Sequence, residues 1–311
     1  MIAETTRRLL DNIQKVIVGR DEPILLTLAS VLCEGHVLIE DVPGIGKTTL
    51  ARALAGSLGL SYRRIQFTPD LLPSDVTGLS WFNQKTQEFE FRPGPVMSQV
   101  VLADEINRAT PRTQSALLEA MQEHQVTVDG VTRLQPRPFL VLATQNPIEL
   151  EGTFPLPEAQ IDRFMLRVEI GYPSEVEENN ILERFRSDDP LQDVKAVTTP
   201  EEVLKLQEQR KDIRVEETVR KYIVKVARAT REHAEIELGA SPRATLALYQ
   251  TSQAWAGIQG RDYVLPDDVK FMAPHVLTHR LMISPRAQLR GRRPDEMVAD
   301  IVDSVPVPVE D

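Results

Sequence analysis

The sequence has little of what marks secreted or membrane-spanning proteins. It contains a single cysteine, Cys33, so no disulfide can form within the chain, and we expect a buried, unreactive thiol in a reducing cytosol. No apolar run is long enough to cross a bilayer. Residues 1–8 also lack the apolar core of a secretion signal. These absences predict a cytoplasmic protein without membrane insertion.

Positive charge is in deficit as well. The 36 Lys and Arg residues face 46 Asp and Glu residues, which gives a formal net charge of -10. Such a chain is not expected to bind nucleic acid or anionic lipid through its overall charge. The length of 311 residues and the hydrophobic content of 41% are enough for about two domains with cores of their own.

Short apolar runs alternate with helical patterns in the first half of the chain. Strands are predicted at residues 36–40, 62–67, 99–103, 139–143 and 165–171, mostly covered on both faces. Helices are predicted at residues 4–17, 23–34 and 47–58. This alternation is typical of an α/β fold with a parallel sheet. After residue 173 only helical patterns follow, so we expect an α/β core over residues 1–173 and an all-α domain over residues 174–311, ending in a frayed tail.

Two segments interrupt the alternation and are predicted to be β-hairpins. Residues 79–91 place Trp81 and Phe82 before a polar turn and Phe89 and Phe91 after it, with Phe89 and Phe91 on one side. Residues 126–134 contain Asp-Gly between two β-branched runs, which is a strong hairpin signal.

The strongest chemical motif joins the strand at 36–40 to the helix at 47–58. In Pro43-Gly44-Ile45-Gly46-Lys47-Thr48, glycines allow backbone N–H groups to surround a phosphate, and the helix N-terminus adds a favourable dipole. Lys47 is expected to reach the β- and γ-phosphates, and Thr48 to bind Mg²⁺. The general pattern has glycine at position 41, where this chain has Asp41.

Two further strands end in polar residues. The run 100–103 is followed by Asp104 and Glu105, and the run 139–143 is followed by Thr144, Gln145 and Asn146. Carboxyl ends of parallel strands meet at one sheet edge, where ligands bind. We expect Asp104 to contact Mg²⁺, Glu105 to activate water, and Asn146 to position that water or touch the γ-phosphate.

Arginines complete the candidate set. Arg163 precedes the last predicted strand, and Arg243 lies in Ser241-Pro242-Arg243, where Ser241 is a helix cap. Either could stabilise the charge of phosphoryl transfer, although an isolated arginine is most often a surface charge. The arginines between residues 280 and 293 are interpreted as a solvated face or a subunit contact, and the His275/His279 pair as part of an ordinary helix rather than a zinc site.

These residues together resemble the MoxR family of AAA+ ATPases over essentially the whole chain. The segments that carry the resemblance are residues 40–48, 102–123, 143–166 and 239–244. The resemblance implies that Asp104 and Glu105 form Walker B, Asn146 is sensor 1, and Arg243 is sensor 2 on a helical lid. It also implies an arginine finger for the neighbouring subunit, which we assign to Arg163, with Arg108, Arg112 and Arg167 as nearby alternatives. It further implies that the segment Val18-Gly19-Arg20 lines the adenine pocket and that the two hairpins are the helix-2 insert and the pre-sensor 1 hairpin. The residues expected to contact nucleotide are Val18, Gly19, Asp41, Val42, Pro43, Gly44, Ile45, Gly46, Lys47, Thr48, Thr49 and Asp104, with Thr48 and Asp104 as metal ligands.

The resemblance further implies a function. ATP hydrolysis with Mg²⁺ would drive chaperone-like remodelling or maturation of a protein client by a homo-oligomeric ring, a hexamer, in which the lid moves relative to the core. A separate protein with a von Willebrand factor A domain is the implied partner. Two alternatives remain open: a nucleic-acid-dependent motor, which the acidic charge disfavours, and a nucleotide-gated scaffold with little turnover, which the intact Asp104, Glu105 and Asn146 disfavour.

Overall fold

A computed structural model of the chain describes residues 1–146, 152–184 and 190–308. Part of the matching segment 143–166 and the last residues of the expected tail therefore lie outside the described residues. Within the described part, no helix has the length and apolar character needed to cross a bilayer.

A five-stranded sheet, in the order β2-β5-β8-β1-β9, forms the centre of the fold, and its strand pairs are parallel. Glu40 of β1 lies opposite Gln145 of β8, and Ala103 of β5 lies opposite Ala143 of β8. Three adjacent strands therefore end at nearly the same level. The strands are β1 (Val37–Glu40), β2 (Tyr62–Gln66), β5 (Val100–Asp104), β8 (Leu140–Gln145) and β9 (Leu166–Val168).

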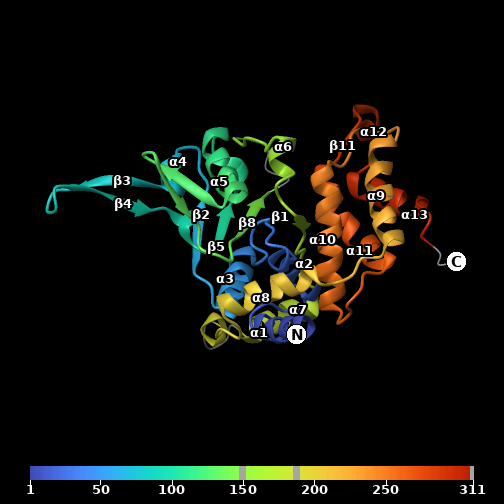
Figure 1. Cartoon of the computed structure of the whole chain (residues 1–311), viewed down its shortest axis with the longest axis horizontal. Helices are drawn as coiled ribbons and strands as arrows, with labels where there is room; N and C mark the ends of the chain where they lie inside the picture. The colour runs from blue at the N-terminus through green and yellow to red at the C-terminus, as the bar shows by residue number, and fades with distance from the viewer. Residues whose placement is uncertain (147–151, 185–189, 309–311) are drawn as a thin grey trace.

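Helices cover both faces of this sheet, as the predicted α/β fold requires (Figure 1). Alternate side chains of a strand enter different hydrophobic clusters: Val37 and Ile39 face one cluster, and Leu38 faces the other. The helices of the first face are α1 (Ile2–Ile13), α2 (Asp21–Leu32) and α3 (Lys47–Leu58); those of the other are α4 (Pro73–Thr77) and α5 (Pro111–Glu123), and the short α6 (Glu158–Ile161) precedes β9.

The C-terminal part is mainly helical, and its core is continuous with that of the sheet. Residues of α1 and α2 share one buried cluster with residues of α8, α9, α10, α11 and α13. The sequence patterns did not predict the short antiparallel ribbon that β10 and β11 add there. The elements are α7 (Glu175–Arg184), α8 (Pro200–Lys211), α9 (Glu217–Glu232), β10 (Ile236–Leu238), α10 (Pro242–Ile258), α11 (Pro266–Leu277), β11 (Met282–Ile283), α12 (Pro285–Leu289) and α13 (Pro294–Ser304).

Two predicted strands differ from expectation. The edge strand β2 is not covered on both faces, because Arg63, Arg64 and Gln66 are exposed. The last strand, β9, ends at Val168 rather than at residue 171. Beyond it the backbone N–H groups of residues 170 and 171 bond to a side chain instead of a strand, as described below.

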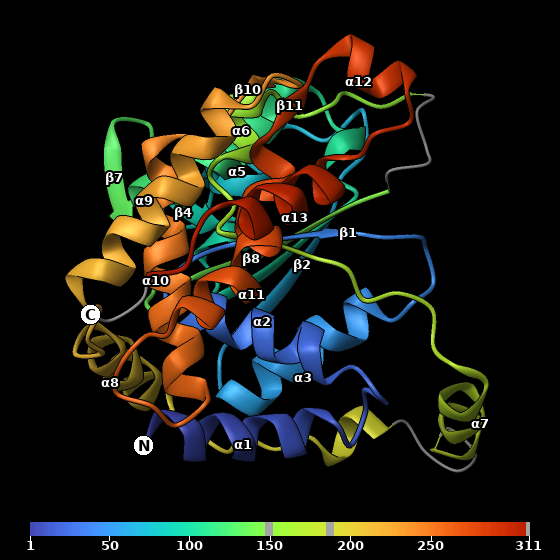
Figure 2. The ribbon, with the colours of Figure 1, turned by 90° about the vertical axis from the view of Figure 1, so that its right-hand side faces the viewer.

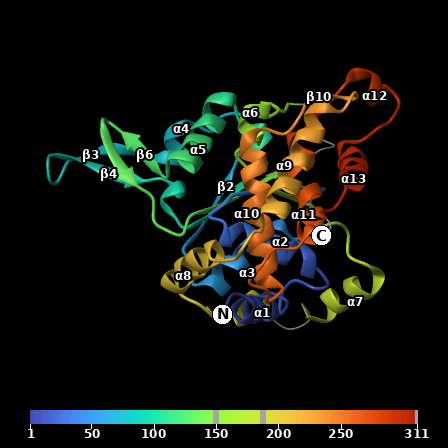
Figure 3. The ribbon, with the colours of Figure 1, turned by 45° about the vertical axis from the view of Figure 1, so that its right-hand side comes forward.

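Both predicted hairpins are confirmed. The first, β3 (Gly78–Asn83) with β4 (Glu88–Pro93), extends away from the sheet (Figure 1). The second, β6 (Gln125–Val128) with β7 (Val131–Leu134), turns at residues 129 and 130 with φ values of 51° and 74°, as a two-residue Asp-Gly turn requires. The two hairpins lie side by side (Figure 3), where the Arg133 guanidinium sits 3.9 Å from the centroid of the Phe91 ring.

Immediately before β1, a buried histidine links three parts of the core. His36 Nδ1 accepts the N–H of Val141 at 3.0 Å, so the proton is on Nε2, which lies 3.2 Å from the carbonyl oxygen of Met121. Protonation of Nδ1 would break the bond to Val141. Burial lowers the pKa of His36 to about 4.

We predict that His36 makes the protein sensitive to acid. Its folded-state pKa lies below the unfolded value, so its stabilising effect is complete above pH 6.5 and is lost as the pH falls towards 4. Between pH 7 and 4.5 the free energy of unfolding, measured with urea, should fall by about 2 kcal/mol through this residue. His36→Asn should flatten that dependence. An equal pH dependence in wild type and His36→Asn would contradict the assignment.

Candidate active site

The three adjacent strand ends carry the candidate residues. The loop after β1 contains Lys47 at the start of α3, β5 ends at Asp104, and Asn146 follows β8. Because β8 lies between β1 and β5, its polar end separates the lysine from the carboxylates. The sheet order therefore brings the three predicted motifs to one edge.

The loop between β1 and α3 has the backbone of a phosphate-binding loop. Gly44 and Gly46 have φ values of 87° and 91°, which residues with side chains rarely adopt. Gly46 directly precedes the first helical residue, Lys47. The N–H groups of the first turn of α3 thus remain available for an anion.

Lys47 is held at the base of this loop. Its ammonium group donates to the carbonyl oxygen of Asp41 at 2.5 Å. Burial lowers the pKa of Lys47, while the carboxylates of Asp41, Asp104 and Glu105 act in the opposite direction. A partly desolvated ammonium group beside carboxylates is suited to an anionic ligand accompanied by a cation.

Asp104 is already bound by two neighbours. One carboxylate oxygen accepts the Arg64 guanidinium at 2.6 and 3.0 Å. The other accepts the Thr144 hydroxyl at 2.6 Å. A cation at Asp104 would therefore compete with the half-exposed side chain of Arg64.

Glu105 is held by different partners. Its carboxylate accepts the side-chain amide of Gln66 at 2.7 Å and lies 3.5 Å from Nε of Arg108. Its N–H donates to the Thr144 hydroxyl at 2.9 Å, and its φ of 55° is in the left-handed region. A non-glycine residue in that conformation is strained, and such strain is found most often at functional sites.

These groups line one polar cavity of about 380 Å³. Thr48 and Asp104 both face it, so the cavity presents a hydroxyl and a carboxylate oxygen, which are donors that suit Mg²⁺. The residues that line it are Pro43, Gly44, Gly46, Lys47, Thr48, Thr49, Arg64, Gln66, Asp104, Glu105, Thr144 and Asn146.

A second, more apolar cavity of about 410 Å³ adjoins the first across the loop. Val16, Ile17 and Val18 form one wall and Ile45 another, whereas Gly171, Tyr172 and Pro173 close it from the segment after β9. Its size and lining suit a purine base. Together the two cavities match the parts of a nucleotide: the apolar cavity suits the base, and the polar cavity suits the phosphates.

Three predicted contact residues lie outside these walls. Gly19 packs against Glu177 so closely that a Cβ atom would lie 1.7 Å from its Oε1 atom. Asp41 and Val42, in the described part of the chain, line neither cavity. The side-chain contacts of Asp41 are instead directed to the segment after β9.

The two predicted arginines lie elsewhere. Arg163 and Arg243 line a third cavity, of about 190 Å³, which shares no residue with the polar cavity. Nε of Arg163 is buried without a hydrogen-bond partner, while Arg243 is exposed. The structure therefore brings these arginines together, but it does not place them at the chain's own phosphate site.

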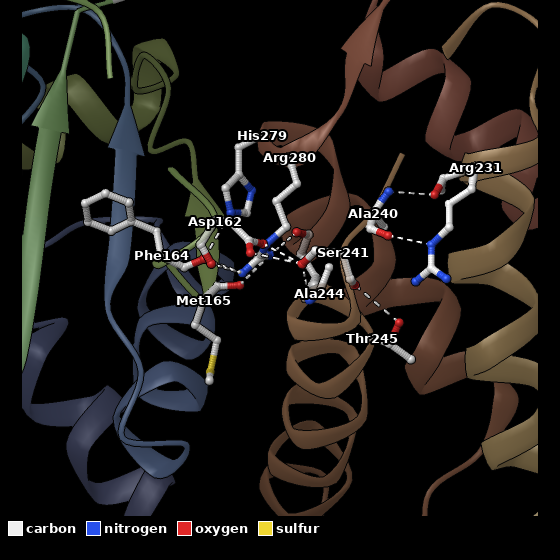
Figure 4. Close-up of polar contacts among 12 residues, drawn as sticks. Asp162, Phe164, Met165, Arg231, Ala240, Ser241, Ala244, Thr245, His279 and Arg280 are labelled. Atoms are coloured by element: carbon white, nitrogen blue, oxygen red, sulfur yellow. Dashed lines mark hydrogen bonds and ion pairs between the residues drawn. The ribbon is translucent and has the colours of Figure 1, made fainter. Parts of the chain in front are cut away.

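The interpretation of Arg280 as part of a solvated face was wrong. Only 2% of its side chain is exposed, and it joins the C-terminal helices to the segment before β9 (Figure 4). The guanidinium donates to the Asp162 carboxylate at 2.9 Å and to backbone carbonyls that include Met165 at 3.2 Å. Asp162 also accepts the hydroxyl of Ser241, the cap of α10, at 2.9 Å. Arg163 and Arg243, which neighbour Asp162 and Ser241 in sequence, are fixed relative to each other by this network.

His275 lies in α11, and His279 lies in the turn that follows this helix. No group of three or more metal-ligating side chains occurs within the described ranges. Nε2 of His279 instead lies 3.1 Å from the carbonyl oxygen of Phe164.

Sequence reasoning missed Arg64 and Gln66. Both lie on β2, whose exposed polar residues reach the acidic pair on β5 across one strand pairing. Two polar residues spaced i, i+2 in the strand after the loop helix place both side chains on one face. That spacing was the available signal.

Comparisons with known proteins agree with this geometry. Residues 36–166 match the model of the "ATPase family associated with various cellular activities (AAA)", and residues 228–301 match the AAA lid domain. The chain is 50% identical over 300 residues to the uncharacterized protein YeaC of Bacillus subtilis, covering 96% of this chain and 94% of that protein. It is 41% identical to Chaperone MoxR1 of Mycobacterium tuberculosis, covering 98% of this chain and 82% of that protein.

A solved structure shows the same fold. A Cytophaga hutchinsonii protein that is classed as an ATPase superposes with a TM-score of 0.93 at 38% identity, covering 99% of this chain and 96% of that chain. Protein MoxR of Methylorubrum extorquens is 30% identical, covering 95% of this chain and 93% of that protein. From its strand-end motifs, its fold and these relatives, the chain belongs to the MoxR family of AAA+ ATPases.

Proposed function

We propose that this ATPase hydrolyses ATP with Mg²⁺ at the polar cavity and couples hydrolysis to remodelling of a protein client. The observation that carries the proposal is the convergence of Lys47, Thr48, Asp104, Glu105 and Asn146 on one cavity beside an apolar one. No other cavity described above combines a helix N-terminus, a lysine and an acidic pair. The base would lie between Val18 and the segment after β9, and the phosphates over the first turn of α3.

The roles of the side chains follow from their positions. Lys47 would bind the β- and γ-phosphates, Thr48 and Asp104 would hold Mg²⁺, which neutralises the phosphate charge when bound, and Asn146 would orient the attacking water. Glu105 would accept a proton from that water. Its carboxylate is engaged by Gln66 and Arg108, so hydrolysis requires that Glu105 leave these partners.

The positions of Arg163 and Arg243 support assembly into a ring. Both arginines line a cavity separate from the chain's own phosphate site, and an arginine added to the lysine and the metal further stabilises the charge of the transition state. We propose that both arginines reach the nucleotide of the neighbouring subunit. Such contacts are head-to-tail and can close into a ring, which we propose to be a hexamer.

The client and the partner would bind elsewhere. Trp81, Phe82 and Phe89 on the first hairpin are 45%, 47% and 76% exposed, an unusual concentration of large apolar side chains. A groove of about 540 Å³ that includes Phe89 and Phe91 separates this hairpin from the second. The relative named a chaperone supports protein remodelling as the outcome. We propose a separate von Willebrand factor A domain protein as partner, a cytoplasmic location, and no role for nucleic acid.

The first prediction separates binding from turnover. Lys47→Ala should abolish nucleotide binding, because no other lysine lines the polar cavity. Glu105→Gln should retain ATP affinity while phosphate release falls by about 100-fold or more, since the general base is lost. Glu119→Gln, on the exposed side of α5, is the matched control and should behave as wild type. Wild-type turnover by Glu105→Gln would rule out the assigned base.

The second prediction tests action between subunits. Arg163→Ala should bind ATP but hydrolyse little, and the same change at the exposed Arg7 of α1 should have little effect. Mixing equal amounts of the Arg163→Ala and Lys47→Ala proteins creates junctions with one intact lysine and one intact arginine. Phosphate release should then recover to roughly a quarter of the wild-type rate if subunits mix at random in a ring. No recovery at any mixing ratio would count against arginine action between subunits.

A further inference from the structure

Asp41 stands where the general phosphate-loop pattern has glycine, and its side chain has a defined set of partners. One carboxylate oxygen accepts the backbone N–H groups of Ile170 at 2.8 Å and Gly171 at 2.7 Å. The other accepts the N–H of Val42 at 2.8 Å. Its carbonyl oxygen accepts the Lys47 ammonium group at 2.5 Å. One residue therefore contacts both the phosphate-binding lysine and the segment that follows β9.

That segment closes the base cavity. Gly171, Tyr172 and Pro173 line the cavity together with Val18 and Ile45. Figure 2 shows the segment after β9 running beside the loop that follows β1 before it reaches α7 at the edge of the molecule. Because β9 has ended at Val168, no ladder bond fixes residues 170 and 171, and the Asp41 carboxylate supplies the bonds instead.

The other side of the segment is held independently. Arg20 donates to the carbonyl oxygen of Gly171 at 3.4 Å and pairs with Glu177 at 3.4 Å. Glu177 in turn accepts the N–H of Ser174 at 2.6 Å. Gly171 is therefore held from two sides, at its carbonyl oxygen by Arg20 and at its N–H by Asp41, whereas the N–H of Ile170 is held by Asp41.

We propose that Asp41 is a positioning residue for the adenine end of the nucleotide. Its carboxylate holds residues 170 and 171 so that the wall formed by residues 171–173 faces the base, and it does not itself touch phosphate. The inference rests on nucleotide binding as proposed above. On this proposal, the part of the nucleotide affinity that comes from the base depends on Asp41, although Asp41 lies within the phosphate-loop motif.

A carboxylate is suited to this task because it offers two acceptor oxygens. Asparagine keeps one acceptor, so Asp41→Asn can satisfy either Val42 or the pair Ile170 and Gly171, but not both. Asp41→Gly keeps neither, although it restores the general phosphate-loop pattern. From the motif alone, Asp41→Gly would leave nucleotide affinity unchanged, whereas the structure predicts a loss of affinity.

The test compares ADP with inorganic pyrophosphate by titration calorimetry on the full chain with excess Mg²⁺. Asp41→Gly should weaken ADP binding about 10-fold or more, since charge-assisted hydrogen bonds to two amides are lost. Pyrophosphate, which has no base, should bind Asp41→Gly at least as tightly as it binds the wild-type protein, because a nearby negative charge is removed. Asp41→Asn should weaken ADP binding to an intermediate extent. If Asp41→Gly does not fold, the same comparison of ADP with pyrophosphate is made on Asp41→Asn. The control Asp21→Asn, an exposed carboxylate at the start of α2, should bind both ligands as wild type does.

Two outcomes would overturn the inference. Equal loss of ADP and pyrophosphate affinity in the Asp41 variants would mean that Asp41 acts through Lys47 and the phosphates. Unchanged ADP affinity would mean that the bonds to Ile170 and Gly171 do not position the wall. Failure of the wild-type protein to bind ADP would instead remove the nucleotide-binding proposal, and this inference with it.

Discussion

The parallel pairing of β1, β8 and β5 is the constraint on which the rest of the site depends. Each strand is followed by a polar segment, and the register that places Glu40 opposite Gln145 and Ala103 opposite Ala143 brings those segments to one level. The lysine after β1 and the carboxylates after β5 can then share a ligand that spans β8. A slip of one residue in either pairing would turn these side chains to the opposite face of the sheet.

Around this edge, the charged groups already satisfy one another. Arg64 occupies the carboxylate of Asp104, and Gln66 with Arg108 holds Glu105, whose backbone is strained. On the proposed function, a nucleotide and its cation would have to replace some of these contacts when they bind. Arg163 and Arg243 lie near a different network, in which the buried Arg280 and its partner Asp162 tie the core to α10. Together with the hydrophobic cluster that core and C-terminal helices share, this network limits how far those helices can move without repacking.

Local sequence patterns predicted most of the sheet and its motifs. Strand, glycine-rich turn and helix follow one another without interruption around Lys47, and an apolar strand leads directly to Asp104, so neighbouring residues sufficed. Contacts between distant segments could not be predicted in this way. Arg280 looked like one of several surface arginines because its partners Asp162 and Met165 lie more than 100 residues away. The strand β9 was predicted to reach residue 171 but ends at Val168. The N–H groups of residues 170 and 171 donate to the Asp41 side chain instead of a neighbouring strand.

On the proposed function, the loop before Lys47 and the acidic pair after β5 bind one triphosphate–magnesium complex. A crystal structure of the chain with a non-hydrolysable ATP analogue and Mg²⁺ tests it most directly. In that structure we expect the phosphates over the first turn of α3 beside Lys47 and the metal bound by Thr48 and Asp104. We also expect Arg64 to be displaced from Asp104. An analogue bound at another cavity, or phosphates at Lys47 with Asp104 still paired to Arg64 and no metal between them, would contradict it.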